Sequence, residues 1–107
     1  MRMWMVDPHK MCRQHLLGEH VEIHMLAGSL LKGRSIKKFL TTGLLEPQSM
    51  RTRHAELVNE MNRRGYQHAS PLPVVDRVPS GAVDRTASAV ALAARCPKCA
   101  TLRETAV

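Results

Sequence analysis

The segment that decides the fold spans residues 7–33 and reads DPHKMCRQHLLGEHVEIHMLAGSLLKG. Asp7 can accept hydrogen bonds from the free N–H groups of a first helical turn, and Pro8 lacks an N–H that would stay unbonded there, so this pair predicts a helix start. Apolar residues then recur at helical spacing as far as Lys32, and Gly33 is typical of a helix end. We therefore expect one long N-terminal helix.

The rest of the chain predicts shorter helices joined by loops. Ser35 can cap a basic helix over residues 36–42 that Gly43 ends, and Glu46-Pro47-Gln48 indicates a loop. Ser49 opens a second amphipathic helix that Gly65 closes, with apolar residues at helical spacing on one face, namely Met50, Leu57, Val58 and Met61.

The C-terminal third has a different composition. Prolines interspersed with valines in residues 70–81 favour an extended surface connection, and Asp84 can cap one further helix that runs to about Arg95. No segment shows a convincing strand pattern. The sequence predicts a compact all-α domain with a long N-terminal helix, a second amphipathic helix and a shorter C-terminal helix. We divide it into a helical core at 1–70 and, at 71–107, a connection, a short helix and a Cys-x-x-Cys tail.

The charge of the chain favours a polyanionic partner. Its 107 residues carry 16 Lys and Arg against 9 Asp and Glu, and no acidic residue occurs between Glu22 and Glu46. Small soluble proteins are often basic without binding nucleic acid, so charge alone does not decide between the two interpretations. Residues 1–6 fall short of a signal-peptide core and no stretch approaches a membrane span. We expect a cytoplasmic protein whose cysteines stay reduced unless they bind metal.

Charged or titratable residues lie in and beside the apolar stripe of the first helix. Glu19 and His20 project within the stripe. Glu19 needs a partner there, and His15 one turn earlier is within reach. Glu22 lies near the edge of the stripe, where a carboxylate is partly desolvated yet accessible. Such a position suits a catalytic acid or base, although a boundary glutamate is more often a solvated flank residue. The stripe itself consists of Cys12, Leu16, Ile23, Leu26, Ala27 and Leu30.

Two patterns carry residue types that bind metals. His20 and His24 stand four residues apart on the first helix, but they lack the His-Glu-x-x-His order of metalloproteases. Cys96 and Cys99 have the spacing of a zinc half-site, which Cys12, His20 or His24 could complete. The cysteines could also form a redox pair or remain unliganded thiols. A structural zinc ion is thus one interpretation of the tail, and no required cofactor is predicted.

Three sequence blocks resemble the pyrimidine-dimer DNA glycosylase/AP-lyase family, to which a phage endonuclease V belongs. In the first, Arg2 follows the N-terminal residue, and Gln14-His15-Leu16 with Glu19 and Glu22 matches the family's Gln-His-Leu-x-x-Glu-x-x-Glu. The second block is the basic run in residues 28–39, which ends in Phe. The third, residues 53–66, resembles an Arg-led helix with Glu-Leu-hydrophobic-x-Glu, followed by Arg-Gly-aromatic.

The resemblance implies an all-α DNA-repair enzyme whose N-terminal amine attacks the damaged nucleotide. The alignment places this nucleophile on Met1, which we expect to be retained because methionine removal requires a small second residue and Arg2 is large. A generic α-amine loses its proton near pH 8 and a lysine only near about 10.4, so α-amines form imines readily at neutral pH. The carboxylate that matches the catalytic one is Glu22.

The resemblance also implies that the partner is double-stranded DNA with damaged or abasic nucleotides, bound by a monomer. The residues expected to hold DNA are Arg2, Arg13, His15, Lys32, Arg34, Lys37 and Lys38.

Two departures from the family put the lesion specificity in doubt. His20-Val21 replaces the family's Tyr-Arg before the catalytic glutamate, and the aromatic-rich C-terminal tail is missing. Two alternatives therefore stand beside the enzyme: a DNA-binding module that keeps the fold without the chemistry, and a small zinc-binding regulatory protein.

Overall fold

Helix α1 (Arg13–Leu31) lies at the centre of the fold in the computed structural model, which describes residues 1–67 and 70–104. The other elements, in chain order, are the 3-10 helix η1 (Pro8–Lys10), α2 (Lys37–Thr41), the 3-10 helix η2 (Pro47–Ser49), α3 (Met50–Arg63), α4 (Arg85–Arg95) and α5 (Pro97–Glu104). No strand occurs in those two ranges, so the predicted all-α class is confirmed. None of these helices is long and apolar enough to cross a membrane.

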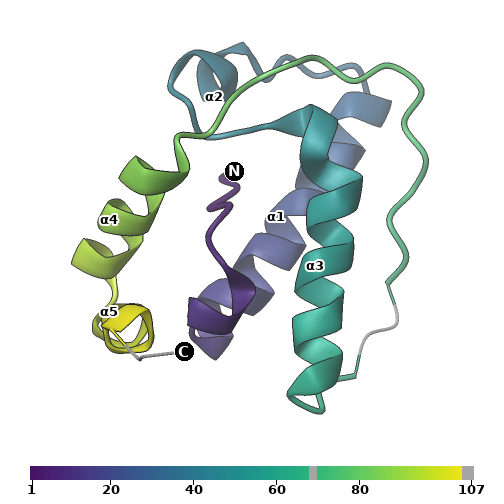
Figure 1. Ribbon diagram of the computed structural model, residues 1–107. Coiled ribbons are helices and arrows are strands. Elements are labelled where there is room, and N and C mark those ends of the chain that lie inside the picture. Colours follow the sequence, from purple (N-terminus) through teal and green to yellow (C-terminus); the bar gives the residue numbers. More distant parts are fainter. Residues whose placement is uncertain (68–69, 105–107) are drawn as a thin grey trace.

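The helices enclose the N-terminal segment. Helix α3 packs along α1 on one side, α4 and α5 pack together on the other, and residues 1–6 run between the two pairs (Figure 1). The short helix η1 contacts both α3 and α5, so it joins the two halves. Removal of apolar surface from water drives this arrangement. The core is formed by Met3, Trp4 and Met11, by Leu16, Ile23, Leu26 and Ala27 of α1, and by Met50, Leu57, Met61 and Leu92.

The predicted start of the long helix is wrong, because residues 8–10 form a separate short helix. Asp7 and Pro8 do begin a helix, and the Asp7 carboxylate accepts from the His9 N–H, but this helix is the separate 3-10 turn η1. The backbone then becomes extended at Met11 and Cys12, with ψ angles of 137° and 165°, and α1 begins only at Arg13. Both residues are buried. Tertiary packing of these two side chains therefore overrides the local continuation signal.

Most other helix limits agree with the sequence prediction to within about two residues. Gly33, Gly43 and Gly65 end α1, α2 and α3 with φ angles of 68°, 71° and 82°, which favour glycine. The Asp84 carboxylate caps α4 by accepting from the Ala87 N–H. Ser49 precedes α3, but its hydroxyl donates to Glu46 and not to the helix. Helix α5, which carries the second cysteine of the tail, was not predicted.

The extended connection at residues 70–81 leads the chain to α4, and its end is fixed to the core. The Gln48 side chain donates to the Gly81 carbonyl at 2.6 Å and accepts from the Gly81 N–H at 3.0 Å. A Cβ atom at Gly81 would lie 2.4 Å from the Leu45 carbonyl oxygen, so only glycine fits there. Arg85 then forms an ion pair with Glu46 at 3.0 Å. These contacts fix the position of α4 against the N-terminal segment.

Candidate active site

The N-terminal segment is held in place by backbone contacts to two distant elements. The Met3 N–H donates to the Leu44 carbonyl at 2.8 Å, and the Ser88 hydroxyl of α4 donates to the Trp4 carbonyl. Met3 and Trp4 are buried, and Met5 takes the left-handed φ of 56°, an uncommon conformation for a residue with a side chain. The segment can therefore reverse direction towards η1 while the first two residues lie beside α1.

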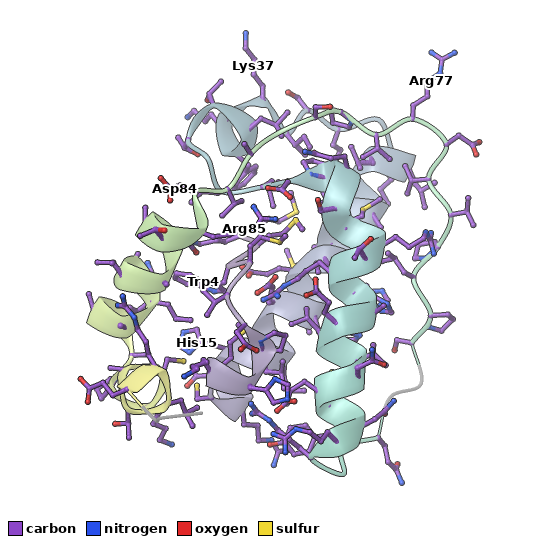
Figure 2. The ribbon with its side chains drawn as sticks, viewed as in Figure 1. Trp4, His15, Lys37, Arg77, Asp84 and Arg85 are labelled. Carbon is purple, nitrogen blue, oxygen red and sulfur yellow. The ribbon has the colours of Figure 1, made fainter. Side chains whose placement is uncertain are left out.

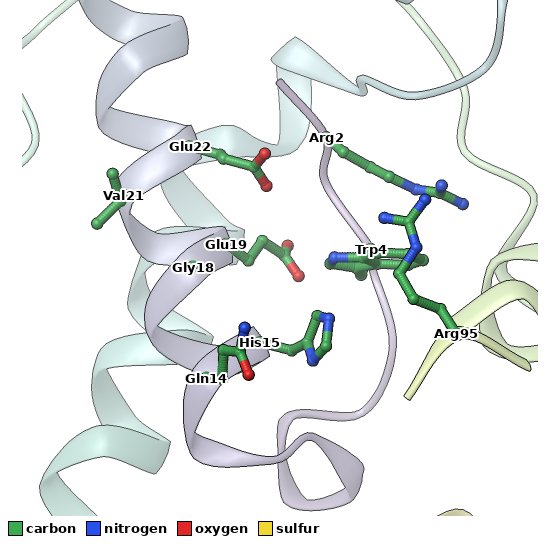
Figure 3. Close-up of a pocket in the computed structure, with 9 residues that line it drawn as sticks. All are labelled: Arg2, Trp4, Gln14, His15, Gly18, Glu19, Val21, Glu22 and Arg95. Atoms are coloured by element: carbon green, nitrogen blue, oxygen red, sulfur yellow. The ribbon is translucent and has the colours of Figure 1, made fainter. Parts of the chain in front are cut away.

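A pocket of about 430 Å³ opens between the N-terminal segment, α1 and α4. Figure 3 shows Glu22, Glu19 and His15 projecting from α1 towards Arg2 and Trp4, with Arg95 of α4 closing the far side. The pocket is lined by Arg2, Trp4, Gln14, His15, Gly18, Glu19, Val21, Glu22 and Arg95. It is the place where the chain start meets the motif on the first helix.

Two arginines stack on Trp4 and make one wall of the pocket cationic. The Arg2 guanidinium lies 3.8 Å from the indole centroid, and that of Arg95 lies 5.3 Å away. Burial and then the charge of Arg95 lower the pKa of Arg2 from its usual value, and the same two causes lower the pKa of His15. Two guanidinium groups side by side attract an anion such as a phosphate, because both can donate charge-assisted hydrogen bonds to it.

Glu22 faces this wall from the middle of α1. It is half-buried, and desolvation raises the pKa of its carboxyl group above the ordinary value. The positive charge of the N-terminal amine is the strongest of the opposing effects that lower this pKa, and the backbone and charge of Arg2 act in the same direction. Glu19 adds a like charge that raises the pKa further. Glu22 thus combines partial desolvation, accessibility and proximity to the chain start.

Glu19 has a different partner from the one expected. Its carboxylate accepts two hydrogen bonds from the Arg53 guanidinium of α3, at 2.6 and 2.9 Å, and both side chains are buried. His15 does not make this contact, because its ring turns towards the cysteines. This ion pair joins two packed helices, so the spacing of residues along one helix does not reveal it. Glu19 therefore ties α1 to α3 at the floor of the pocket.

Comparison with known proteins identifies the family. The model of the family described as pyrimidine dimer DNA glycosylase matches residues 1–74. The chain belongs to this family. A search of curated proteins and a search of solved structures gave no match. The match agrees with the resemblance read from residues 1–70, and membership in a DNA glycosylase family indicates DNA as the substrate class.

The glycosylase-family match ends before α4, although α4 contributes to the pocket. Arg95 lies outside the matched residues and was not predicted as a site residue, and neither were Trp4 and Gln14. Arg95 is the last residue of a helix whose other residues are mostly small and apolar. From the sequence, its charge is explained by the favourable interaction of a cation with the C-terminal end of a helix. Only the packing of α4 on the N-terminal segment places it at the site. The buried Trp4 gave no signal beyond its apolar character.

The predicted DNA-binding residues of this glycosylase-family chain fall into two groups. Arg2 and His15 line the pocket. Arg13 is exposed and its guanidinium lies 4.9 Å from the Tyr66 ring, away from the pocket lining. The basic run is exposed at and beyond the far end of α1, and none of its cations lines the pocket; Figure 2 shows Lys37 projecting away from Trp4 and His15. This run comprises Lys32, Arg34, Lys37 and Lys38.

The residues with metal-binding side chains form two separate clusters. Cys12, His15, Cys96 and Cys99 meet at one point, with their ligand atoms all within 4.8 Å of one another. His20, His24 and His54 form the other cluster by the same measure. The sequence interpretation that His20 or His24 completes a site with the tail is wrong, because both histidines face α3. His15 takes the fourth position beside the three cysteines.

Proposed function

We propose that this protein is a DNA glycosylase with AP-lyase activity, acting on pyrimidine dimers or abasic sites through a Schiff base on the N-terminal amine of Met1. The observation that carries the proposal is Glu22. Its half-buried carboxylate interacts with the positive charge of the chain start, inside a pocket with two arginines on its opposite wall. The family match supports the glycosylase part of the proposal.

The first step would release the damaged base. The unprotonated Met1 amine attacks C1′ of the nucleotide, the bond from C1′ to the base breaks, and the base leaves with the bonding electron pair and takes up a proton. Loss of one amine proton and opening of the sugar ring, in which the ring oxygen O4′ takes up a proton, then give a protonated imine between Met1 and C1′. Ionised Glu22 stabilises the cationic imine and accepts and returns protons.

The second step would break the DNA strand. A base removes a proton from C2′ of the imine, and the bond from C3′ to its phosphate oxygen breaks, so the phosphate leaves on the 3′ side. Water then hydrolyses the imine and restores the Met1 amine. On an abasic site, the amine attacks the open-chain aldehyde and the same elimination follows. No oxidant, reductant or cofactor enters this sequence of steps.

DNA binding would use both groups of cations. Arg2 and Arg95 face the pocket and would contact the phosphates beside the lesion, with His15 as a neutral hydrogen-bonding group, whereas the basic run from Lys32 to Lys38 would contact the duplex farther along. The damaged nucleotide must leave the stack to reach Met1, at a cost of a few kcal/mol. Trp4 is buried beneath the arginines, so it offers little surface for stacking on a base. The protein would act as a monomer.

Borohydride trapping on duplex DNA with one abasic site tests the nucleophile. Reduction of the imine should leave one protein cross-linked to one DNA strand, and peptide mapping should place the link on the Met1 nitrogen. Intact mass first establishes that the purified chain starts at Met1. A two-residue N-terminal extension should abolish trapping, because it moves the amine away from Glu22, and the same extension at the C-terminus serves as the matched control.

Two other outcomes of the trapping experiment would change the proposal. A cross-link through a lysine would keep the lyase but remove Met1 from its mechanism. DNA affinity without any cross-link or strand cleavage, on both dimer and abasic substrates, would contradict the enzyme and favour a DNA-binding module that keeps the fold.

A further inference from the structure

The three cysteines of this chain, its full complement, converge on His15 in the folded protein. Cys12 precedes α1, and His15 lies in its first turn. Cys96 and Cys99 flank the start of α5, 84 and 87 residues after Cys12 in sequence. All three cysteines are buried. The cluster is separate from Glu22 and the N-terminal amine, and the proposed chemistry does not use the thiols.

All four ligand atoms of the cluster lie within 4.8 Å of one another, and three of their separations are close to the edges of a tetrahedron around a metal ion. With zinc bonds of about 2.3 Å to sulfur and 2.05 Å to nitrogen, ideal geometry sets two sulfurs about 3.8 Å apart and a sulfur and a nitrogen about 3.6 Å apart. The sulfurs of Cys12 and Cys96 are 3.8 Å apart. The Nδ1 atom of His15 lies 3.3 Å from the Cys12 sulfur and 3.6 Å from the Cys99 sulfur.

Two backbone N–H groups are directed at the sulfurs. The Cys12 N–H donates to the Cys99 sulfur at 3.3 Å, and the Cys99 N–H donates to the Cys96 sulfur at 3.5 Å. Such donors stabilise the negative charge of a thiolate more than a neutral thiol. A disulfide requires sulfurs about 2.05 Å apart, and the 3.8 Å separation of Cys12 and Cys96 is the edge length of a metal site.

We propose that Cys12, His15, Cys96 and Cys99 bind one Zn²⁺ ion as a structural Cys₃His site. Protein atoms fill all four tetrahedral positions, which distinguishes a structural site from a catalytic one that keeps a position for water. Binding releases the protons of the three thiols, so zinc affinity falls with decreasing pH. The ion would join the start of α1 to α5 and thereby fasten the C-terminal segment, outside the family match, to the matched core.

The proposed site also orients a pocket residue. Zinc on Nδ1 leaves the proton of the neutral imidazole on Nε2, and His15 lines the pocket with its ring edge-on to Trp4, at 5.9 Å between centroids. His15 would thus present a fixed N–H donor towards the DNA-binding wall. In this way zinc would act as a positioning element for the pocket without touching the reacting atoms.

The three-histidine cluster provides the internal control for the metal test. His20, His24 and His54 lie with ring centroids 4.8 to 5.1 Å apart, and the Nε2 atom of His24 is buried without a hydrogen-bond partner. A metal held there would have nitrogen ligands alone. A metal in the proposed site has three sulfur ligands, so the two sites differ in spectrum as well as in residues.

Metal analysis and cobalt substitution of the full chain test the proposal. Protein purified with zinc present and then dialysed should retain about one equivalent, lost in Cys99→Ser and kept in His24→Asn. Co²⁺ in place of zinc should give thiolate charge-transfer bands and the intense visible bands of tetrahedral coordination, unchanged in His24→Asn and shifted in His15→Asn. Chelation should lower the melting temperature by at least about 10 °C.

Several results would overturn the inference. They are protein that stays metal-free after exposure to zinc, Co²⁺ spectra without thiolate bands, and zinc lost in His24→Asn but kept in Cys99→Ser. Should Cys99→Ser fail to fold, the Co²⁺ spectrum of the unaltered protein decides alone, because charge-transfer bands require sulfur ligands. These measurements do not depend on DNA cleavage. The zinc site can therefore be disproved while the proposed enzyme activity holds, and the activity can be disproved while the zinc site holds.

Discussion

Glu19 and Glu22 lie one turn apart on α1 and have opposite surroundings. Glu19 is completely buried and its charge is met by two hydrogen bonds from Arg53. Glu22 is half-buried, makes no such pair with an arginine side chain, and has a raised pKa because desolvation outweighs the nearby positive charges. A buried carboxylate whose charge is fully matched stabilises the fold, whereas an incompletely matched carboxylate at a pocket suits proton transfer.

The largest effect is expected from Glu22→Gln. The substitution keeps the shape but removes the charge that would stabilise the imine, so strand cleavage should fall by about 1,000-fold, measured in single-turnover assays on abasic DNA. The raised pKa means that ionised Glu22 costs stability above its own pKa, so the variant should be no less stable at pH about 7. Glu56→Gln, on an exposed face of α3, is the matched control, and equal activity in both variants would remove Glu22 from the mechanism.

Disrupting the ion pair of Glu19 with Arg53→Met should instead reduce the stability of the fold. Removing the arginine leaves a buried carboxylate unpaired, so the free energy of unfolding should fall by about 3 kcal/mol in urea titrations. The double variant Glu19→Leu with Arg53→Met removes both charges and should recover most of that loss. If the single variant matched the original protein in stability, the ion pair would not have the structural role that its burial indicates.

A third carboxylate, Glu60, is also paired with arginines and makes the stability of the fold depend on pH. Hydrogen bonds from Arg63 and then Arg64 hold the pKa of Glu60 at about 2, although its burial opposes this. Its contribution is therefore complete above the unfolded value of about 4.3 and is lost as pH falls towards 2. Glu60→Gln should lower the free energy of unfolding by roughly 2 kcal/mol at neutral pH. In denaturation experiments below pH about 4, the difference in this free energy between the variant and the original protein should become smaller. If the difference in unfolding free energy did not change with pH, a lowered pKa of Glu60 in the folded protein would be contradicted.

The smallest effect is expected from charges outside the pocket. Reversing Lys37 and Lys38 to Glu should weaken duplex binding by about tenfold and reduce the salt slope by up to about two. The single-turnover rate at saturating protein should stay the same, because neither lysine lines the pocket. Arg77→Glu, on the exposed connection, is the control. An unchanged salt slope would remove α2 from the DNA interface.

The fold was largely predictable because local signals and packing agree along most of the chain. The glycines that end α1, α2 and α3 and the Asp84 cap act within a few residues, so sequence spacing identifies them. The prediction failed where packing opposed the local signal, at Met11 and Cys12. It also missed α5, whose short amphipathic pattern is weak on its own and whose place depends on Cys99 and α4.

The candidate site was predictable only in the part that lies on one helix. The helical spacing along α1 placed Glu22 and His15 on one side of the helix. The blocks that resemble the family gave the number of residues between Glu22 and the chain start. Arg95, and the partnership of Glu19 with Arg53, arise from helices that meet only in the folded protein. The choice of His15 over His20 beside the cysteines has the same origin, since a rotation around α1 decides which histidine faces α5.

The position of residues 1–6 between two helix pairs has a consequence for the timing of synthesis. The first residues to leave the ribosome cannot dock until Ser88 and Arg95 have followed them, because α4 supplies the hydrogen bond to Trp4 and the second guanidinium over its ring. Contacts between positions this far apart close large loops and form late in folding. A nascent chain therefore carries an exposed amine but no assembled pocket. We therefore expect the pocket to assemble only after α4 has been translated.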